Sequence, residues 1–364
     1  MTPAVSIIVP VYNKAEDLKK SIPALLAQPL GNLEIVCVDD GSTDGSASVL
    51  ADLAARDGRV KIVTQENKGT SVARKTGVLA SQGEYVMFLD PDDGFAPDAC
   101  GQAYRAAKSA DADILQFGTD IHFISDLPDS LKKQICGFFT PQQGTFDGSG
   151  TILNACFPDV EHVRSYNLCM RIFRGDICRK AFAEVANERI LIGEDGYAFI
   201  LCAFFAQRAV SIPDRLYIYN LGGGVSGTAR TLAHVKRCCG DARKVHAALL
   251  DFADRHPDGA AGIRRCAETF REFLIKPFLF EPPESFGTEE EQHEAAAELL
   301  GMLPPERWIE ILSKERTARE ADLKRAWDQA DLLQEKYDAI RNSTVWRMSL
   351  PLRKIADFMK GRRN

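Results

Sequence analysis

The chain has 364 residues, of which 45% are hydrophobic and 26% charged, a composition typical of folded globular proteins that excludes wholesale disorder. At about 150 residues per domain, the length predicts about two domains. The net charge of −6 is unevenly distributed: residues 341–364 carry seven Lys and Arg against one Asp, which leaves −12 on the first 340 residues. An acidic body with a basic tail argues against a general nucleic-acid binder and predicts a local anionic partner for the tail.

Targeting and cysteine patterns favour a cytoplasmic protein. The longest apolar run, near Tyr197–Ala206, has about ten residues, about half of what a membrane-spanning helix needs. Met1 leads directly into the run Val5–Val9 without a basic or apolar leader, so we do not expect secretion. The ten cysteines form no C-x-x-C pair and the six histidines show no H-x-x-x-H spacing, which predicts reduced thiols and no zinc site.

The first 120 residues alternate strand and helix patterns. Short apolar runs predict strands at Val5–Val9, Glu34–Val38, Val60–Thr64, Tyr85–Leu89 and Ile114–Phe117. Helical patterns occur between them at Ala15–Ala27, Asp44–Arg56, Thr70–Ser81 and Pro97–Ala110. Alternation at this spacing predicts right-handed crossovers and a mainly parallel sheet flanked by helices, an α/β fold.

The remainder of the chain is less regular. Ser125–Gly150, rich in Gly, Pro, Gln and Asp, is predicted to be a loop, and Glu194–Ala206 a buried helix. Two short strands are predicted around a Pro-Asp turn, at Ala209–Ile212 and Arg215–Asn220. Helical patterns then follow at Thr231–His256, Ala260–Phe280, Thr288–Met302 and Pro305–Glu315. We therefore expect an α/β domain over residues 1–230, a helical region over 231–312, and a helix with a tail over 313–364.

An acidic cluster follows the fourth predicted strand, where Leu89 leads into Asp90, Pro91, Asp92 and Asp93. Carboxylates at this density repel one another unless a cation lies among them, and ligands of open α/β sheets bind at the carboxyl ends of strands. Hard oxygen ligands suit Mg²⁺ or Mn²⁺, and Mg²⁺ typically combines one or two carboxylates with substrate phosphates. The cluster is consistent with a metal–diphosphate site, and also with an acidic turn that caps the next helix.

Two neighbouring strands end in polar or aromatic residues as well. The second strand runs into Asp39 and Asp40, and the first into Tyr12 and Asn13. A ring and a carboxylate on the same sheet edge can hold a nucleotide base, although acids at this position also cap the following helix. Glu194 and Asp195 precede a buried helix, so they are either its N-terminal acids, favoured by the helix dipole, or a catalytic pair.

Three segments carry a family resemblance. VSIIVPVYNKAEDLKKSI, EIVCVDDGSTDGS and ENKGTSVARKTGVLASQGEYVMFLDPDD resemble the inverting family 2 of nucleotide-sugar glycosyltransferases, which have the GT-A (Rossmann-like) fold. The match is dense over residues 5–98 and weaker at Gly193–Asp195 and Tyr217–Asn220. Residues 342–353 are similar to a tail found on some bacterial polysaccharide glycosyltransferases.

The resemblance implies roles for individual residues. Pro10, Tyr12 and Asp39 would line the base and ribose, and Lys68 and Arg74 would lie near the nucleotide. We add Asn13 and Asp40 to the nucleotide site because they end the same strands. The D-x-D element would be Asp90 and Asp92, with Asp92 the main metal ligand. Asp195 would be the general base, with Glu194 as the less favoured choice. The chain departs from the family at Lys75, where Asn is frequent, which leaves donor contacts there open.

The resemblance implies an inverting glycosyltransferase of polysaccharide or cell-envelope synthesis. It would move a sugar from a nucleotide-sugar, with a UDP-sugar as the expected donor, to a hydroxyl of a glycan or lipid-linked acceptor, using Mn²⁺ or Mg²⁺. One alternative is a nucleotidyltransferase, although residues 10–14 lack the Gly-rich phosphate loop expected of one. The other is a non-catalytic protein that binds nucleotide-sugars.

The last 50 residues suggest two further contacts. Apolar residues spaced 3-4-3-4-3 between Leu323 and Ile340 form a short heptad seam, which would serve a homodimer or pack on the chain's own body. From Pro351 onward, apolar residues at helical spacing alternate with basic ones. Such a helix would lie on the inner face of the cell membrane as a peripheral anchor, or dock on the acidic body.

Overall fold

The computed structural model describes residues 2–124, 126–222, 231–279, 287–311 and 313. The heptad seam over residues 323–340 and the basic tail over 341–364 lie outside the described residues. The chain divides into two compact units. One comprises Met1–Gly227 with Lys244–Phe270, and the other Thr228–Arg243 with Arg271–Asn364.

The N-terminal half of the sheet in the first unit is parallel, as predicted. Strands β1 (Val5–Val11), β2 (Leu33–Asp39), β3 (Val60–Thr64) and β4 (Tyr85–Phe88) lie in the order β3-β2-β1-β4. Every residue of β1, β2 and β4 is buried, which explains why these strands read as continuous apolar runs.

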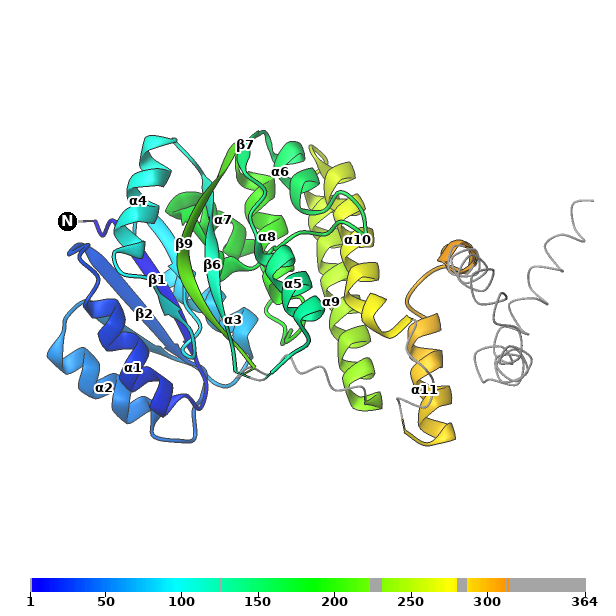
Figure 1. Cartoon of the computed structure of the whole chain (residues 1–364), viewed down its shortest axis with the longest axis horizontal. Helices are drawn as coiled ribbons and strands as arrows, with labels where there is room; N and C mark the ends of the chain where they lie inside the picture. Colours follow the sequence, from blue (N-terminus) through cyan, green and yellow to red (C-terminus); the bar gives the residue numbers. More distant parts are fainter. Residues whose placement is uncertain (1, 125, 223–230, 280–286, 312, 314–364) are drawn as a thin grey trace, which may run out of the picture. The chain divides into compact units, whose positions relative to one another are not determined.

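Helices cover both faces of this parallel part. Helices α1 (Ala15–Leu26) and α2 (Ser46–Arg56) pack side by side (Figure 1). Helix α3 (Thr70–Ala80) connects β3 to β4 in the reverse direction along the sheet, so a right-handed crossover places it on the other face. There it packs against α7 (Gly175–Glu184) and α8 (Glu194–Phe205).

The second half of the sheet is mixed, so the parallel arrangement is less extensive than predicted. Strand β8 (Arg171–Arg174) lies antiparallel between β4 and β6 (Ile114–Phe123). Strand β9 (Arg208–Leu221) pairs in parallel with β6 and antiparallel with β5 (Gly94–Phe95) and β7 (Gly144–Asp147). The helix-flanked α/β sheet is thereby confirmed, with the parallel pairs confined to β1–β4 and to β6–β9.

Two sequence predictions need correction in this region. The predicted loop over residues 125–150 contains helix α5 (Asp129–Phe139) and strand β7. Helix α5 carries Leu131, Ile135 and Phe138 at helical spacing, but the Gly, Pro, Gln and Asp residues around it led to the loop prediction, and none of its residues is fully buried. The two short strands around Pro213 are one strand, β9, with a register shift opposite Gly118. A Cβ at Gly118 would lie 3.0 Å from the Pro213 carbonyl oxygen, so the glycine allows this irregularity.

Helix α4 (Ala99–Ser109) lies where a helix was predicted, whereas α6 (Ser149–Cys156), α7 and the 3₁₀ turn η1 (Leu168–Met170) were not predicted. Helices α9 (Leu232–Arg255), α10 (Ala260–Leu279) and α11 (Glu289–Leu300) follow β9. A capping box formed by Thr288 and Glu291 begins α11. In the described part of the chain, helices long and apolar enough to cross a bilayer are absent.

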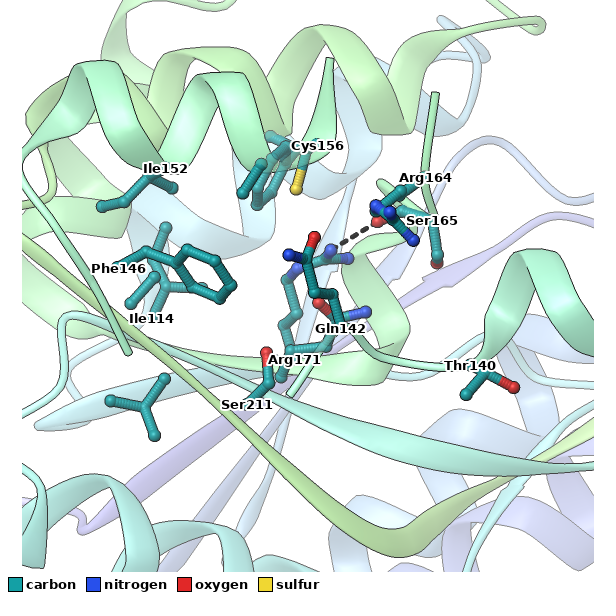
Figure 2. A pocket seen from close by; sticks show the side chains of 15 residues that line it. Ile114, Thr140, Gln142, Phe146, Ile152, Cys156, Arg164, Ser165, Arg171 and Ser211 are labelled. Carbon is teal, nitrogen blue, oxygen red and sulfur yellow. Dashed lines mark hydrogen bonds between the residues drawn. The ribbon is translucent and has the colours of Figure 1, made fainter. Parts of the chain in front are cut away.

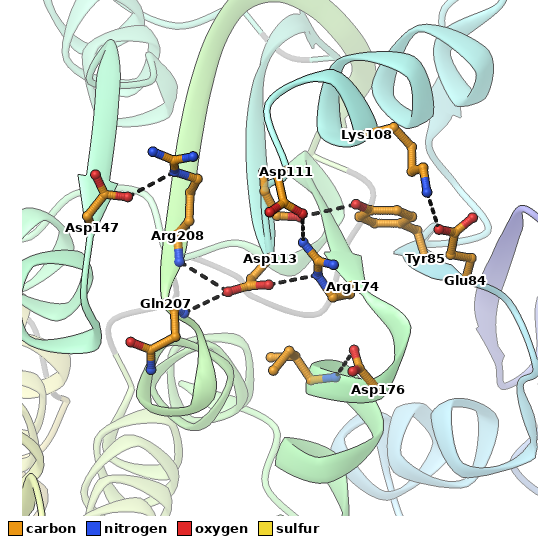
Figure 3. Close-up of polar contacts among 12 residues, drawn as sticks. Glu84, Tyr85, Lys108, Asp111, Asp113, Asp147, Arg174, Asp176, Gln207 and Arg208 are labelled. Atoms are coloured by element: carbon orange, nitrogen blue, oxygen red, sulfur yellow. Dashed lines mark hydrogen bonds and ion pairs between the residues drawn. The ribbon is translucent and has the colours of Figure 1, made fainter.

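Ion pairs fasten the sheet at the amino end of β4. Arg174, the last residue of β8, pairs with Asp111 at 2.6 Å and with Asp113 at 2.7 Å (Figure 3). Asp113 also accepts hydrogen bonds from the backbone amides of Gln207 and Arg208, just before and at the start of β9. Since Arg174 pairs in register with Tyr85 at the start of β4, this network lies at the opposite end of β4 from Asp90.

Candidate active site

The sheet brings together the strand ends that the sequence singled out. Strand β1 lies between β2 and β4. Tyr12 and Asn13 directly follow β1, Asp39 is the last residue of β2, and Asp90 comes just after β4. Because these strands are parallel, the residues lie at the same edge of the sheet. The residues belong to one unit of the chain. The predicted juxtaposition of a ring, an acid pair and an acidic cluster thus has a geometric basis.

Arg74 links the acidic cluster to the Glu194–Asp195 pair. Its side chain is 3% exposed, and its guanidinium pairs with Asp90 at 2.9 Å and with Glu194 at 3.4 Å, and forms a short ion pair with Asp195. The partners lie 16, 120 and 121 residues away in sequence. We expected Arg74 near the nucleotide; its bonds make it the cation that holds three carboxylates together.

The Glu194–Asp195 pair begins α8, after Gly193 in a left-handed conformation with φ of 83°. Burial, followed by the charge of Asp195, raises the pKa of Glu194 to about 8, although Arg74 opposes the shift. Burial also raises the pKa of Asp195, while Arg74 and a hydrogen bond from the Leu168 backbone amide lower it. The two carboxyls therefore titrate as a coupled pair. Glu194 is the one that favours its protonated form, which leaves Asp195, paired with Arg74, as the favoured base.

Asp92 has a partner that the sequence reading missed. The Lys14 Nζ atom lies 2.9 Å from Asp92 and 3.3 Å from Asp17. Burial lowers the pKa of Lys14, but the hydrogen bond and charge of Asp92 outweigh it and raise the pKa overall. The sequence did contain a signal for this ion pair, because Lys14 directly follows Asn13 at the sheet edge where the acids lie.

Asp93 has a structural role. It is 8% exposed and accepts hydrogen bonds from the Tyr217 hydroxyl at 2.7 Å and the Asn220 backbone amide at 2.8 Å. The Asn220 side chain donates to the Asp92 carbonyl oxygen at 2.7 Å. Burial raises the pKa of Asp93 to about 7, and Asp90 and Asp92 add to the shift. Asp93 therefore ties the acidic turn to β9.

Asp40 shapes the turn before α3. Its buried carboxylate accepts from the backbone amides of Lys68 at 2.8 Å and Gly69 at 2.7 Å, and from the Gln65 side chain at 2.7 Å. Gly69 has φ of 86°, a value that favours glycine. Three donors on a buried carboxylate favour a structural role for Asp40 over the predicted nucleotide contact.

The other predicted nucleotide residues differ in accessibility. Pro10 is buried in β1, whereas Tyr12 is 46% exposed and Lys68 is exposed. Asp39 is buried and accepts from the Ser42 amide at 3.0 Å. Asn13 has φ of 52°, and its side chain accepts from the Thr43 amide at 2.8 Å. Tyr12 and Lys68 thus present surface to a ligand, while Asp39 and Asn13 also hold the turn after β2.

Asp90 and Asp92 fit a metal site completed by substrate. Their side chains are 33% and 23% exposed, and among the described residues each carboxylate uses one oxygen, on Arg74 and on Lys14 respectively. Clusters of three or more His, Cys, Asp or Glu side chains suited to a metal are absent from the described part of the chain. A donor set of two carboxylates matches Mg²⁺ or Mn²⁺ held jointly with a diphosphate.

Comparisons with known proteins place part of the chain among glycosyltransferases. Residues 6–178 match the model of glycosyl transferase family 2. The chain is similar to the putative glycosyltransferase EpsH of Bacillus subtilis, with 41% identity over 29% of this chain and 31% of EpsH. It is also similar to the glycosyltransferase GlyA of Streptococcus pneumoniae, with 39% identity over 60% of this chain and 31% of GlyA. The chain thus spans about a third of the length of these curated relatives.

Solved structures share the fold. The crystal structure of S. aureus TarS 1-349 is similar over 83% of this chain and 81% of that one, with 18% identity and a TM-score of 0.57. The mannosyltransferase PcManGT from Pyrobaculum calidifontis is similar over 97% of this chain and 84% of that one, with 16% identity and a TM-score of 0.50. The chain thus has a GT-A-like fold, and its residues 6–178 match the family 2 glycosyltransferases.

Proposed function

We propose that this chain is an inverting glycosyltransferase that moves a sugar from a nucleotide-sugar to a hydroxyl of a glycan or lipid-linked acceptor. The observation that carries the proposal is the Arg74 bridge, which joins the D-x-D carboxylate Asp90 to the acid pair that contains Asp195. A donor-binding element and a candidate base are thereby held in one site. TarS has been solved with UDP-GlcNAc, which supports a UDP-sugar as the donor to test first.

On the donor side, Tyr12 offers an exposed ring for the base, and Lys68, whose backbone amide donates to Asp40, offers an exposed cation. Asp90 and Asp92 would hold Mn²⁺ or Mg²⁺, which, when bound, neutralises charge on the departing diphosphate. PcManGT has been solved with GDP-Man and Mn²⁺, which supports this choice of metal. Lys14, 2.9 Å from Asp92, places a further positive charge beside the same carboxylate.

On the acceptor side, Asp195 takes the proton of the attacking hydroxyl. The acceptor oxygen forms a bond to the anomeric carbon while the bond from that carbon to the phosphate oxygen breaks, so the nucleoside diphosphate leaves and the configuration inverts. The ion pair with Arg74 keeps the Asp195 carboxylate ionised and oriented. Glu194, whose pKa lies at about 8, keeps its proton near neutral pH and spares the site a second adjacent negative charge.

The decisive experiment is incubation with a panel of nucleotide-sugars and acceptors in the presence of Mn²⁺ or Mg²⁺. Release of nucleoside diphosphate together with a glycosylated product supports the proposal. A nucleotidyltransferase would release no nucleoside diphosphate here, but would release pyrophosphate when given a nucleoside triphosphate and a sugar phosphate. A non-catalytic protein would bind the donor without turnover. Loss of product formation in Asp195→Asn, with donor binding retained, separates catalysis by this site from a contaminating activity.

We further propose a peripheral place on the inner face of the cell membrane. The seven basic residues among residues 341–364 support it, since each basic residue near an anionic surface contributes about 1 kcal/mol. Co-sedimentation with anionic vesicles at low salt, compared between the full chain and a version ending at Ile340, tests this. Light scattering of the same two proteins tests the homodimer proposed for the heptad seam over residues 323–340.

A further inference from the structure

Arg171, at the start of β8, is a buried cation that the mechanism above does not use. It is 1% exposed, and among the described residues it forms no ion pair with a carboxylate. Burying an arginine without such a partner costs free energy, so its charge needs compensation from other groups.

The guanidinium of Arg171 joins a turn to helix α8. It donates hydrogen bonds to the backbone carbonyl oxygens of Ser165 and Asn167. It also lies 4.3 Å from the centre of the Phe199 ring, one helical turn after Asp195. Figure 2 shows Arg171 in the wall of a cavity of about 30 Å³, with its hydrogen bond to Ser165.

Both of these contacts lead to Asp195. The carbonyls of Ser165 and Asn167 belong to the turn that presents the Leu168 amide, and this amide donates to the Asp195 carboxylate. Phe199 fixes the guanidinium against the helix that carries Asp195. Burial lowers the pKa of Arg171, against a smaller upward effect of Cys156 and then of Asp195. Burial raises the pKa of Asp195, against a downward effect of Arg74 and, less strongly, of Arg171.

We propose that Arg171 is a positioning residue for Asp195, which holds the turn over residues 165–168 against α8 and supplies a second positive charge behind the base. The inference rests on the proposed function. Arg74 pairs directly with Asp195 on the side of Asp90, whereas Arg171 reaches it through the Leu168 amide and through space. The base would thus lie between two buried arginines.

The charge and the hydrogen-bonding fork of Arg171 have separable effects. The titratable and charged groups whose electrostatics couple to Asp195 come from each element around it: Glu194, Arg74, Asp90, Arg171, Tyr166, Cys169 and Tyr219. Two of them are cations. Arg171→Met removes one cation, so the pKa of Asp195 should rise. The acidic limb of the pH profile of kcat/KM, where the rate falls as the base takes up a proton, should then move to higher pH by about half to one unit. Arg171→Lys keeps the charge but loses the planar fork, so kcat should fall about tenfold with little movement of that limb.

The test measures kcat/KM against pH for both variants, together with donor binding. Arg174→Met is the matched control, because Arg174 ends the same strand but pairs with Asp111 and Asp113. We expect its pH profile and kcat to match the unmodified chain, and donor affinity to stay within about twofold in all three variants. Because Arg171 borders a cavity, added guanidinium at millimolar concentration should partly restore activity to Arg171→Ala.

An unshifted acidic limb in Arg171→Met, with the unmodified chain active, would overturn this inference alone. An equal shift in Arg174→Met would overturn it as well, since the effect would then belong to the strand. If Arg171→Met does not fold, the lysine variant decides: unchanged kcat overturns the positioning role, and a reduced kcat with an unmoved limb supports it. Absence of transfer by the unmodified chain would overturn the proposed function, and this inference with it.

Discussion

Replacing Arg74 by methionine should weaken the fold of the first unit in a pH-dependent way. The substitution keeps an unbranched side chain of similar length but removes the cation shared by Asp90, Glu194 and Asp195. The Arg74 side chain is 3% exposed, and those of Glu194 and Asp195 are 18% and 14% exposed. Removing one partner of a buried ion pair costs about 3–5 kcal/mol. Asp90, 33% exposed, adds little because water screens it.

Proton uptake limits this loss. Without Arg74, the pKa of Asp195 and that of Glu194, already about 8, should rise further. When folding raises the pKa of a group, the resulting stabilisation is fully present at pH values below the pKa of the unfolded state. This stabilisation is lost as the pH rises through the pKa of the folded state. The deficit of the variant should therefore be small near pH 5 and largest at pH 8 and above.

Thermal unfolding at pH 5, 6.5 and 8 measures the effect, with Arg174→Met as the control. Arg174 is 31% exposed and pairs with Asp111, which is 82% exposed, and with Asp113, which is 13% exposed, so its replacement should cost less than that of the buried Arg74, about 1–2 kcal/mol. For a unit of this size, 3–5 kcal/mol corresponds to a loss of roughly 6–20 °C in Tm. An Arg74→Met protein that melts within about 2 °C of the unmodified chain at pH 8 would refute the reasoning.

Three further predictions concern donor, base and metal. Asp92→Ala should abolish metal-dependent donor binding while the far-UV circular dichroism stays unchanged; UDP binding with unaltered Mn²⁺ dependence would contradict the metal assignment. Asp195→Asn should keep the donor Kd within about twofold but lower kcat by about 10²–10⁴-fold, and near-normal turnover would move the base elsewhere. Lys14→Met should tighten Mn²⁺ binding to the donor-free protein a few-fold, because it frees the Asp92 oxygen that the ammonium engages at 2.9 Å; weaker Mn²⁺ binding, by calorimetry, would show that Lys14 does not compete.

The parallel half of the fold was predictable because its signals are local. β1, β2 and β4 are buried throughout, so they read as apolar runs with helical patterns between them. Strand β8 and helix α5 were not predicted. β8 has four residues and contains two arginines, and α5 contributes no fully buried side chain. Their places in the fold depend on pairing and packing with distant segments, which a local pattern does not encode.

The candidate site was predictable as a set of strand ends and not as a set of bonds. Sequence spacing placed Asp39, Asp90 and Asp92 at one edge of the sheet. It could not show that Lys14 pairs with Asp92 across 78 residues, or that Arg74 reaches Asp195 across 121. Ion pairs of this kind follow from how α1, α3 and α8 pack, and lysines and arginines are too frequent for their partners to be chosen from sequence.

Carboxylates that look alike in sequence differ in role because their environments differ. Asp93 adjoins Asp92, yet it is buried against Tyr217 and Asn220, and its pKa rises to about 7. A carboxyl that bonds a hydroxyl and a backbone amide in the interior serves the fold, whereas Asp92, 23% exposed and pairing with one lysine, remains open to a ligand. Burial and existing partners, more than residue type, decide which acids of this site can meet a substrate.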